Sequence, residues 1–184
     1  MGKWLFIAFT FLAGQTFAQK DTWHRGVVVT SENAVITGEL FFHAMEDVLV
    51  IRHDSVTRVL CAATIRSFNV YDQSANINRK FISLSDKNEF GRKRIYEVVV
   101  NGAVPVIRRL KSEAGYDNDD EYLYYFIQDG EIKSLRKFRS ELYPDVHTKL
   151  AVEEKNFHLN PNRMADAIRF IMLYNRSSAI LASR

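Results

Sequence analysis

The stretch from Trp23 to Tyr71 constrains the fold of this 184-residue chain more than any other. Short runs of Val, Ile, Leu, Phe and Thr are separated there by polar clusters at regular intervals. This pattern is typical of antiparallel strands joined by tight turns, because successive side chains of a strand point to opposite faces. We therefore expect a β-meander at the start of the folded chain, with strands over residues 23–30, 34–43, 47–53, 56–61 and 64–71.

The predicted sheet continues to Ile132. Further strands are expected over residues 79–85, 94–100, 103–110 and 121–128. Asn101-Gly102 predicts a tight hairpin turn, since both residues tolerate positive φ. Pro105 cannot donate to a strand ladder, so its strand is predicted to lie at an edge of the sheet. Gly38 indicates a bulge or a close approach of another backbone segment.

Helical spacing of apolar residues begins after Glu131. Ser134 is a suitable cap for a first helix, Pro144 suits the first turn of a second, and Asn160-Pro161 predicts the start of a third. The third helix carries a broad apolar stripe, which predicts that it docks on the rest of the protein. The members of this stripe are Met164, Ala167, Ile168, Ile171, Met172 and Tyr174.

These elements predict an α+β fold. An antiparallel twisted β-sheet or partly closed barrel is expected over residues 19–132, followed by a short C-terminal helical segment over 133–184. The helical segment is expected to pack on the sheet, as separate layers of helix and sheet do when they share a core. The residues expected to make this contact are Leu135, Phe138, Ile168 and Ile171.

The first 18 residues have the pattern of a secretory signal peptide. Lys3 precedes an apolar run over residues 5–13, and Thr16-Phe17-Ala18 is a small-x-small cleavage site. The apolar run is shorter than the roughly 20 residues that a membrane span needs. We therefore expect an exported protein of the periplasm or cell surface whose mature chain begins at Gln19 and has no transmembrane span.

Charge and cysteine content limit the possible partners. The formal net charge is +3 and falls by one unit when Lys3 is removed, which does not support nucleic-acid binding by bulk charge. Basic runs at residues 92–94, 108–111 and 136–139 are interpreted as solvated faces or as residues flanking turns. Cys61 is the single cysteine, so an intramolecular disulfide is excluded, and its apolar neighbours predict a buried, inert thiol.

The strongest candidate site is an acidic loop. Asp117, Asp119 and Glu121 place carboxylates at alternate positions, and oxygen ligands are what Ca²⁺ prefers. The loop lacks the glycine and the distal glutamate of an EF-hand, and the alternative that we favour is an exposed connection between strands. A calcium-stabilised module remains a minor alternative.

Histidines at predicted strand ends suggest a second candidate site. His43 and His53 could meet at one end of the meander, where Cys61 or Asp54 would complete a zinc site. Histidines that simply occupy turns are the alternative that we favour. The chain contains no G-x-S-x-G, S-x-x-K, dinucleotide or Walker motif, so we assign no catalytic residue and expect no cofactor.

An aromatic strand is predicted over residues 122–127. Tyr122, Tyr124 and Phe126 share one face, and Leu123, Tyr125 and Ile127 share the other. Apolar residues on both faces indicate that other parts of the protein cover both faces. We therefore interpret the strand as part of the core of the sheet, beneath the docked C-terminal helices. The alternative is an aromatic surface that binds a peptide or a glycan.

Both ends of the mature chain resemble small exported envelope proteins of Gram-negative bacteria that have no assigned function. The resemblance rests on W-H-R-G-V-V-V, T-G-E-L-F-F and D-V-L-V near the start, and on Y-L-Y-Y-F-I-Q-D-G-E-I-K-S-L, E-L-Y-P-D-V, F-H-L-N and A-I-R-F-I-M-L-Y-N near the end. It implies an N-terminal β-meander, short C-terminal helices and export to the envelope.

The preferred functional hypothesis is a non-enzymatic binding or structural module of the envelope, with another envelope protein or a glycan as partner. The alternative from a different class is an envelope hydrolase with an unrecognised carboxylate or histidine site, because two carboxylates can suffice for hydrolysis of a glycoside.

Overall fold

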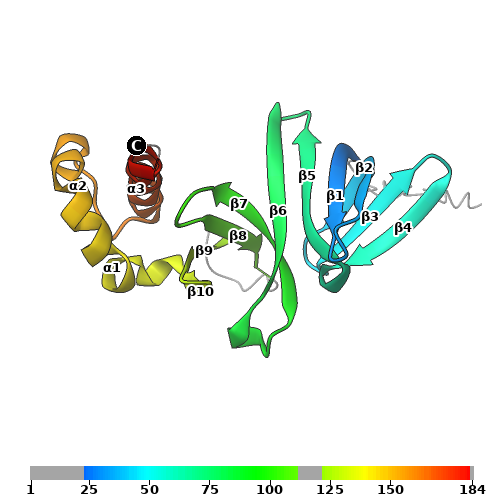
Figure 1. Ribbon diagram of the computed structural model, residues 1–184, viewed down its shortest axis with the longest axis horizontal. Helices are drawn as coiled ribbons and strands as arrows, with labels where there is room; N and C mark the ends of the chain where they lie inside the picture. The colour runs from blue at the N-terminus through cyan, green and yellow to red at the C-terminus, as the bar shows by residue number, and fades with distance from the viewer. Residues whose placement is uncertain (1–22, 112–121, 183–184) are drawn as a thin grey trace, which may run out of the picture.

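The computed structural model describes residues 23–111 and 122–182 and has an α+β fold. Its sheet is antiparallel, open and strongly twisted, and ten strands pair in the order β10-β9-β8-β7-β6-β5-β1-β2-β3-β4 (Figure 1). The strands are β1 (His24–Thr30), β2 (Val35–His43), β3 (Val48–His53), β4 (Val56–Cys61), β5 (Ile65–Asp72), β6 (Ile77–Ser85), β7 (Lys93–Val100), β8 (Val106–Leu110), β9 (Tyr122–Gln128) and β10 (Glu131–Ser134). The predicted fold class is therefore confirmed.

The helices follow the sheet and gather beside β7–β10 at one end of the molecule (Figure 1). They are α1 (Phe138–Glu141), α2 (Tyr143–Phe157) and α3 (Met164–Ala182), and short 3-10 turns are η1 (Ala62–Thr64), η2 (Lys87–Glu89) and η3 (Leu135–Lys137). Within the described ranges, none of the helices combines the length and the apolar character that crossing a membrane requires.

The sheet carries two separate hydrophobic cores. The C-terminal core joins the sheet to the helices, and it contains the predicted contact residues Leu135, Phe138 and Ile171, with Ile168 packed against it. The N-terminal core lies on β1–β7, where Val28, Leu49 and Ile65 are completely buried. Residues of the helices and of the sheet thus share the C-terminal core.

A short connection forces the N-terminal part of the sheet to curl. β4 and β5 are separated in the sheet by β3, β2 and β1, which is about 19 Å in a flat sheet at the usual strand spacing. The chain passes from Cys61 to Ile65 through η1 alone, and four residue steps reach at most about 14 Å. The strands must therefore curve around the N-terminal core for the connection to close.

Asp47 fixes this curl from the β2–β3 turn. Its carboxylate accepts a 2.8 Å hydrogen bond from the backbone N–H of Ile95 and lies 2.9 Å from Arg94 Nη1, at the start of β7. The hydrogen bond to Asp47 is the largest cause that raises the pKa of Arg94. The side chain of Asp47 thus joins two segments that strand pairing does not connect.

The β7–β8 connection differs from the predicted two-residue turn. β7 ends at Val100 and β8 begins at Val106, so residues 101–105 form the connection. Asn175 of α3 binds this segment: its Oδ1 accepts from Val104 N at 2.8 Å, and its Nδ2 donates to Val104 O at 2.8 Å. The predicted pairing of the two strands is confirmed, but the two-residue Asn-Gly turn is wrong, because a helix more than 70 residues away holds a longer connection in place.

Pro105 does not mark an edge strand. β8 pairs with β7 on one side and with β9 on the other, so it is internal. Pro105 lies just before β8, and its carbonyl accepts a 3.0 Å hydrogen bond from Ile127 N. The missing N–H is therefore accommodated outside the ladder, and the edge prediction is wrong.

Three other local predictions can be compared with the structure. A Cβ added to Gly38 would lie 2.4 Å from the Arg52 carbonyl oxygen, which confirms the close backbone approach. The third helix begins at Met164, later than predicted, because the Asn160 side chain accepts from Asn162 N in a turn that precedes the helix. Ser134 precedes a 3-10 turn and forms no side-chain cap.

Candidate functional site

A row of cross-strand partners crosses the sheet from one core to the other. Its members, each paired with the next, are Val28, Phe68, Phe81, Glu97, Arg108 and Tyr124. Directly opposed residues of antiparallel strands share a face, so the whole row lies on the face that bears both cores. Glu97 and Arg108 stand between the cores, where a charge without a partner would be costly.

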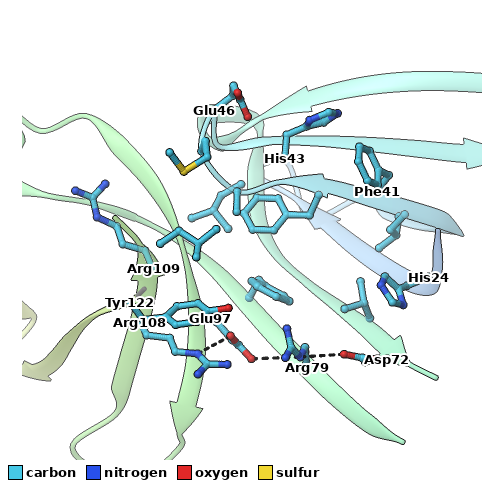
Figure 2. A pocket seen from close by; sticks show the side chains of 18 residues that line it. His24, Phe41, His43, Glu46, Asp72, Arg79, Glu97, Arg108, Arg109 and Tyr122 are labelled. Carbon is cyan, nitrogen blue, oxygen red and sulfur yellow. Dashed lines mark hydrogen bonds and ion pairs between the residues drawn. The ribbon is translucent and has the colours of Figure 1, made fainter. Parts of the chain in front are cut away.

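Four residues of β5–β8 form an alternating series of charges, which we call the ion chain: Asp72, Arg79, Glu97 and Arg108. Arg108 Nε donates to Glu97 Oε2 at 2.7 Å. Arg79 Nε lies 3.6 Å from Glu97 Oε1 and 3.4 Å from Asp72 Oδ2. Figure 2 shows the four side chains in a line joined by these contacts. The two positive and two negative charges balance one another.

Asp72 is held in its ionised form. The Ser74 hydroxyl donates to Asp72 Oδ1 at 2.6 Å, and the backbone N–H groups of Ser74 and Ala75 donate to the same oxygen. The hydrogen bond from the Ser74 hydroxyl is the main cause that lowers the pKa of Asp72, and the positive charge of Arg79 adds to it. A carboxyl with a lowered pKa is a persistent anion at neutral pH rather than a proton donor.

Arg108 is fixed at the other end of the ion chain. Its guanidinium carbon lies 4.2 Å from the centre of the Tyr122 ring, and its Nη1 donates to the Tyr124 hydroxyl at 3.3 Å. Burial alone would lower the pKa of Arg108, but the hydrogen bonds to Glu97 and Tyr124 outweigh burial and raise it. The aromatic ring and the carboxylate together hold the guanidinium in one orientation.

The ion chain lines a cleft of about 560 Å³. Labelled side chains of β1 and β2, including His24, Phe41 and His43, lie across the cleft from Tyr122 and Arg108 (Figure 2). This volume falls within the range of small-molecule sites in proteins. Because the lining combines aromatic rings with oriented charges, the cleft has the composition of a binding site. We call it the charged cleft.

The predicted calcium ligands Asp117, Asp119 and Glu121 lie outside the described residues. The carboxylates of this loop therefore stay a sequence prediction. β8 ends at Leu110 and β9 begins at Tyr122, so the described residues that flank these positions in the sequence are Lys111 and Tyr122.

The predicted zinc residues are not brought together. His43 is opposite Val48 at one end of the β2–β3 pair, and His53 is at the other end, opposite Val56 of β4. Within the described ranges no group of three or more His, Cys, Asp or Glu side chains could hold a metal ion. The prediction that His43 and His53 converge is wrong. β2 and β3 are antiparallel, so their last residues lie at opposite ends of the hairpin.

Cys61 is exposed, so the predicted burial of its thiol is wrong. The residue lies on β4, an edge strand of the sheet. A hydrogen bond with the backbone of Ala63 is the largest cause that lowers the pKa of the thiol. The apolar neighbours that suggested a buried position belong to a strand that is covered on one side at most.

The core interpretation of the aromatic strand is confirmed for two of its residues. Phe126 is completely buried in the C-terminal core and Tyr124 packs against that core, as the core interpretation predicts. Tyr125 faces the opposite side, where its ring contacts Tyr96 edge-on at 5.7 Å between centroids. Tyr122 differs from these residues, since its ring lines the charged cleft.

The ion chain itself was not recognised in the sequence. The run at 108–111 was interpreted as a solvated face, but the side chains of Arg108 and Arg109 are only 21% and 16% exposed, and each is paired with a glutamate. The sequence did contain an indication of the ion chain, because Glu97 and Arg108 are charged residues within largely apolar strands. Identifying them as partners also required the strand register.

No known family model, no curated protein and no solved structure matches this chain.

Proposed function

We propose that this protein is an exported protein of the bacterial envelope that binds a ligand in the charged cleft without transforming it. Export is supported by the leader pattern of residues 1–18. The observation that carries the binding role is the pairing of the cleft carboxylates with arginines beside aromatic side chains. Such groups orient a ligand through fixed charges and ring surfaces.

A hydrolase that uses the same carboxylates is the competing hypothesis. A general acid at neutral pH needs a raised pKa, as a carboxyl obtains in an apolar site. The pKa of Asp72 is instead lowered. Glu97 Oε2 accepts a 2.7 Å hydrogen bond from Arg108 and is therefore already engaged. These environments favour a role in holding charges in place over proton transfer.

Site-specific photo-cross-linking in the native envelope tests the proposal. A benzophenone amino acid replaces Tyr122 in the charged cleft, and in a matched control it replaces Val59, which is 68% exposed on the edge strand β4. We expect the variant at position 122 to capture a discrete ligand and the variant at 59 not to capture it. Equal capture at both positions, or none at 122, would refute binding in the cleft.

A further inference from the structure

The acceptor groups of the charged cleft are already engaged. Asp72 Oδ1 accepts three hydrogen bonds from Ser74 and Ala75, and its Oδ2 faces Arg79. The two oxygens of Glu97 face Arg108 and Arg79. Each carboxylate therefore accepts hydrogen bonds through one oxygen, and its other oxygen faces the positive charge of Arg79, so its charge is already balanced by an arginine of the chain.

The donor groups of the cleft are less fully used. Arg79 Nε is buried and forms no hydrogen bond in the described part of the chain, but it lies 3.4 Å from Asp72 Oδ2 and 3.6 Å from Glu97 Oε1 in ion pairs. The donors of Arg79 that remain for a ligand are therefore its two terminal nitrogens. Arg108 donates through Nε and Nη1, which leaves Nη2. A ligand that binds these remaining donors must supply acceptors.

The remaining surroundings limit the size and charge of such a ligand. The lining carries as many carboxylates as arginines, so a ligand with several negative charges would meet no excess of positive charge; these residues are Glu46, Asp72, Glu97, Arg79, Arg108 and Arg109. Phe42, Phe81 and Tyr122 provide apolar surface in the same cleft. A ligand that fits this lining carries a single anionic group on an apolar body.

We propose that the charged cleft binds a monocarboxylate with an apolar body, whose carboxylate accepts hydrogen bonds from Arg79. A guanidinium matches a carboxylate in geometry and can donate two parallel hydrogen bonds to it. This inference rests on the proposed function and adds the class of ligand. The same chemistry is found in a fatty acid and in the C-terminus of an apolar peptide, and the test separates these two sources.

Calorimetric titration of the mature chain tests the assignment with defined probes. The probes are decanoate, N-acetyl-Leu-Phe with a free carboxylate, and the uncharged amide of each. At least one acid is expected to bind roughly tenfold or more tightly than its own amide, because a hydrogen bond to a charged group is worth at least that factor. The acid that binds more tightly identifies the source. Failure of both acids to bind, or amides that bind as tightly as the acids, would overturn the proposal.

Substitutions of Arg79 link the affinity to the proposed contact. Arg79→Gln is expected to abolish the preference for acid over amide, and Arg79→Lys to retain part of it through its charge. Arg58→Gln is the matched control, since Arg58 is exposed on β4 and does not line the cleft. Thermal melts establish that each variant is folded. The comparison of acid with amide on the unaltered chain tests the proposal even where a variant fails to fold.

Two results of this series would contradict the proposal: Arg79→Gln with an undiminished preference for the acid, or Arg58→Gln with the same loss as Arg79→Gln. Either result would reject the carboxylate ligand but leave the cross-linking at position 122 as an independent measure of binding in the cleft. A failure of cross-linking would instead reject the proposed function itself.

Discussion

Replacing Asn175 by leucine should release α3 from the β7–β8 connection. Asn175 is buried, with 8% of its surface exposed, and its amide bonds to both backbone groups of Val104 and weakly to the Asn101 carbonyl at 3.4 Å. Leucine is similar in size but offers neither donor nor acceptor. The substitution therefore removes the hydrogen bonds with little change in volume.

The expected cost follows from the groups left behind. Val104 is itself buried, so its N–H and C=O would lose their partners in a place that water reaches poorly. Each unsatisfied buried group costs about 1–3 kcal/mol, which gives roughly 2–6 kcal/mol for the two. At about 2–4 °C per kcal/mol for a chain of this size, a loss of about 3 kcal/mol lowers Tm by roughly 6–12 °C.

Thermal denaturation followed by circular dichroism measures this effect on the mature chain. Arg176→Leu is the matched control, because Arg176 is the next residue of α3 and is exposed. Its effect should be within about 0.5 kcal/mol, as for most surface substitutions. An Asn175→Leu variant that melts within about 1 °C of the unaltered chain, or together with the control, would refute the role assigned to the amide.

Four further outcomes are expected. Ile171→Asp places a charge at a fully buried position of the C-terminal core and should cost several kcal/mol in urea denaturation, and an unchanged midpoint would show that α3 is not docked. Asp72 has a lowered pKa in the folded state, so the stability that it contributes is present above its unfolded pKa, near 3.8, and is lost as pH falls through the lower folded pKa. The free energy of unfolding of Asp72→Asn should therefore decline less steeply in acid than that of the unaltered chain. Intact mass of protein isolated from the envelope should correspond to a chain that starts at Gln19, and a retained Met1 would contradict export. Melts with millimolar Ca²⁺, Mg²⁺ or chelator should superimpose, whereas a Ca²⁺-selective rise in Tm that is lost in Asp119→Ala would establish the acidic loop as a site.

The strands could be predicted because their signal is local. Alternation between apolar and polar residues depends on the geometry of one strand, and it located β1–β5 to within a few residues. The sequence did not decide between a twisted sheet and a partly closed barrel, so the degree of curl was not predicted. It is decided by strand order, since the short η1 connection has to reach from β4 to β5. Strand order is a property of the whole chain that no local pattern contains.

The local predictions that are wrong share one cause. Asn101-Gly102 has the composition of a two-residue turn, yet Asn175 selects a longer connection from 71 residues away. Cys61 has apolar neighbours, yet its strand lies at an edge. In both cases a tertiary contact, or the lack of a neighbouring strand, decides against the local preference. The separation of His43 from His53 is different, because hairpin geometry alone predicts it.

The position of Glu97 and Arg108 is the strongest argument that the charged cleft has a function. The row that contains them begins with Val28, Phe68 and Phe81, so apolar residues at 97 and 108 would extend the N-terminal core toward the C-terminal one. Replacing a buried ion pair by apolar residues of similar volume is often neutral or stabilising, by about 1–4 kcal/mol. Stability alone therefore does not require charges at this place. An arginine fixed by a glutamate and a tyrosine ring offers oriented donors in the cleft between the two cores, which a leucine cannot, and this is what the proposed binding role requires.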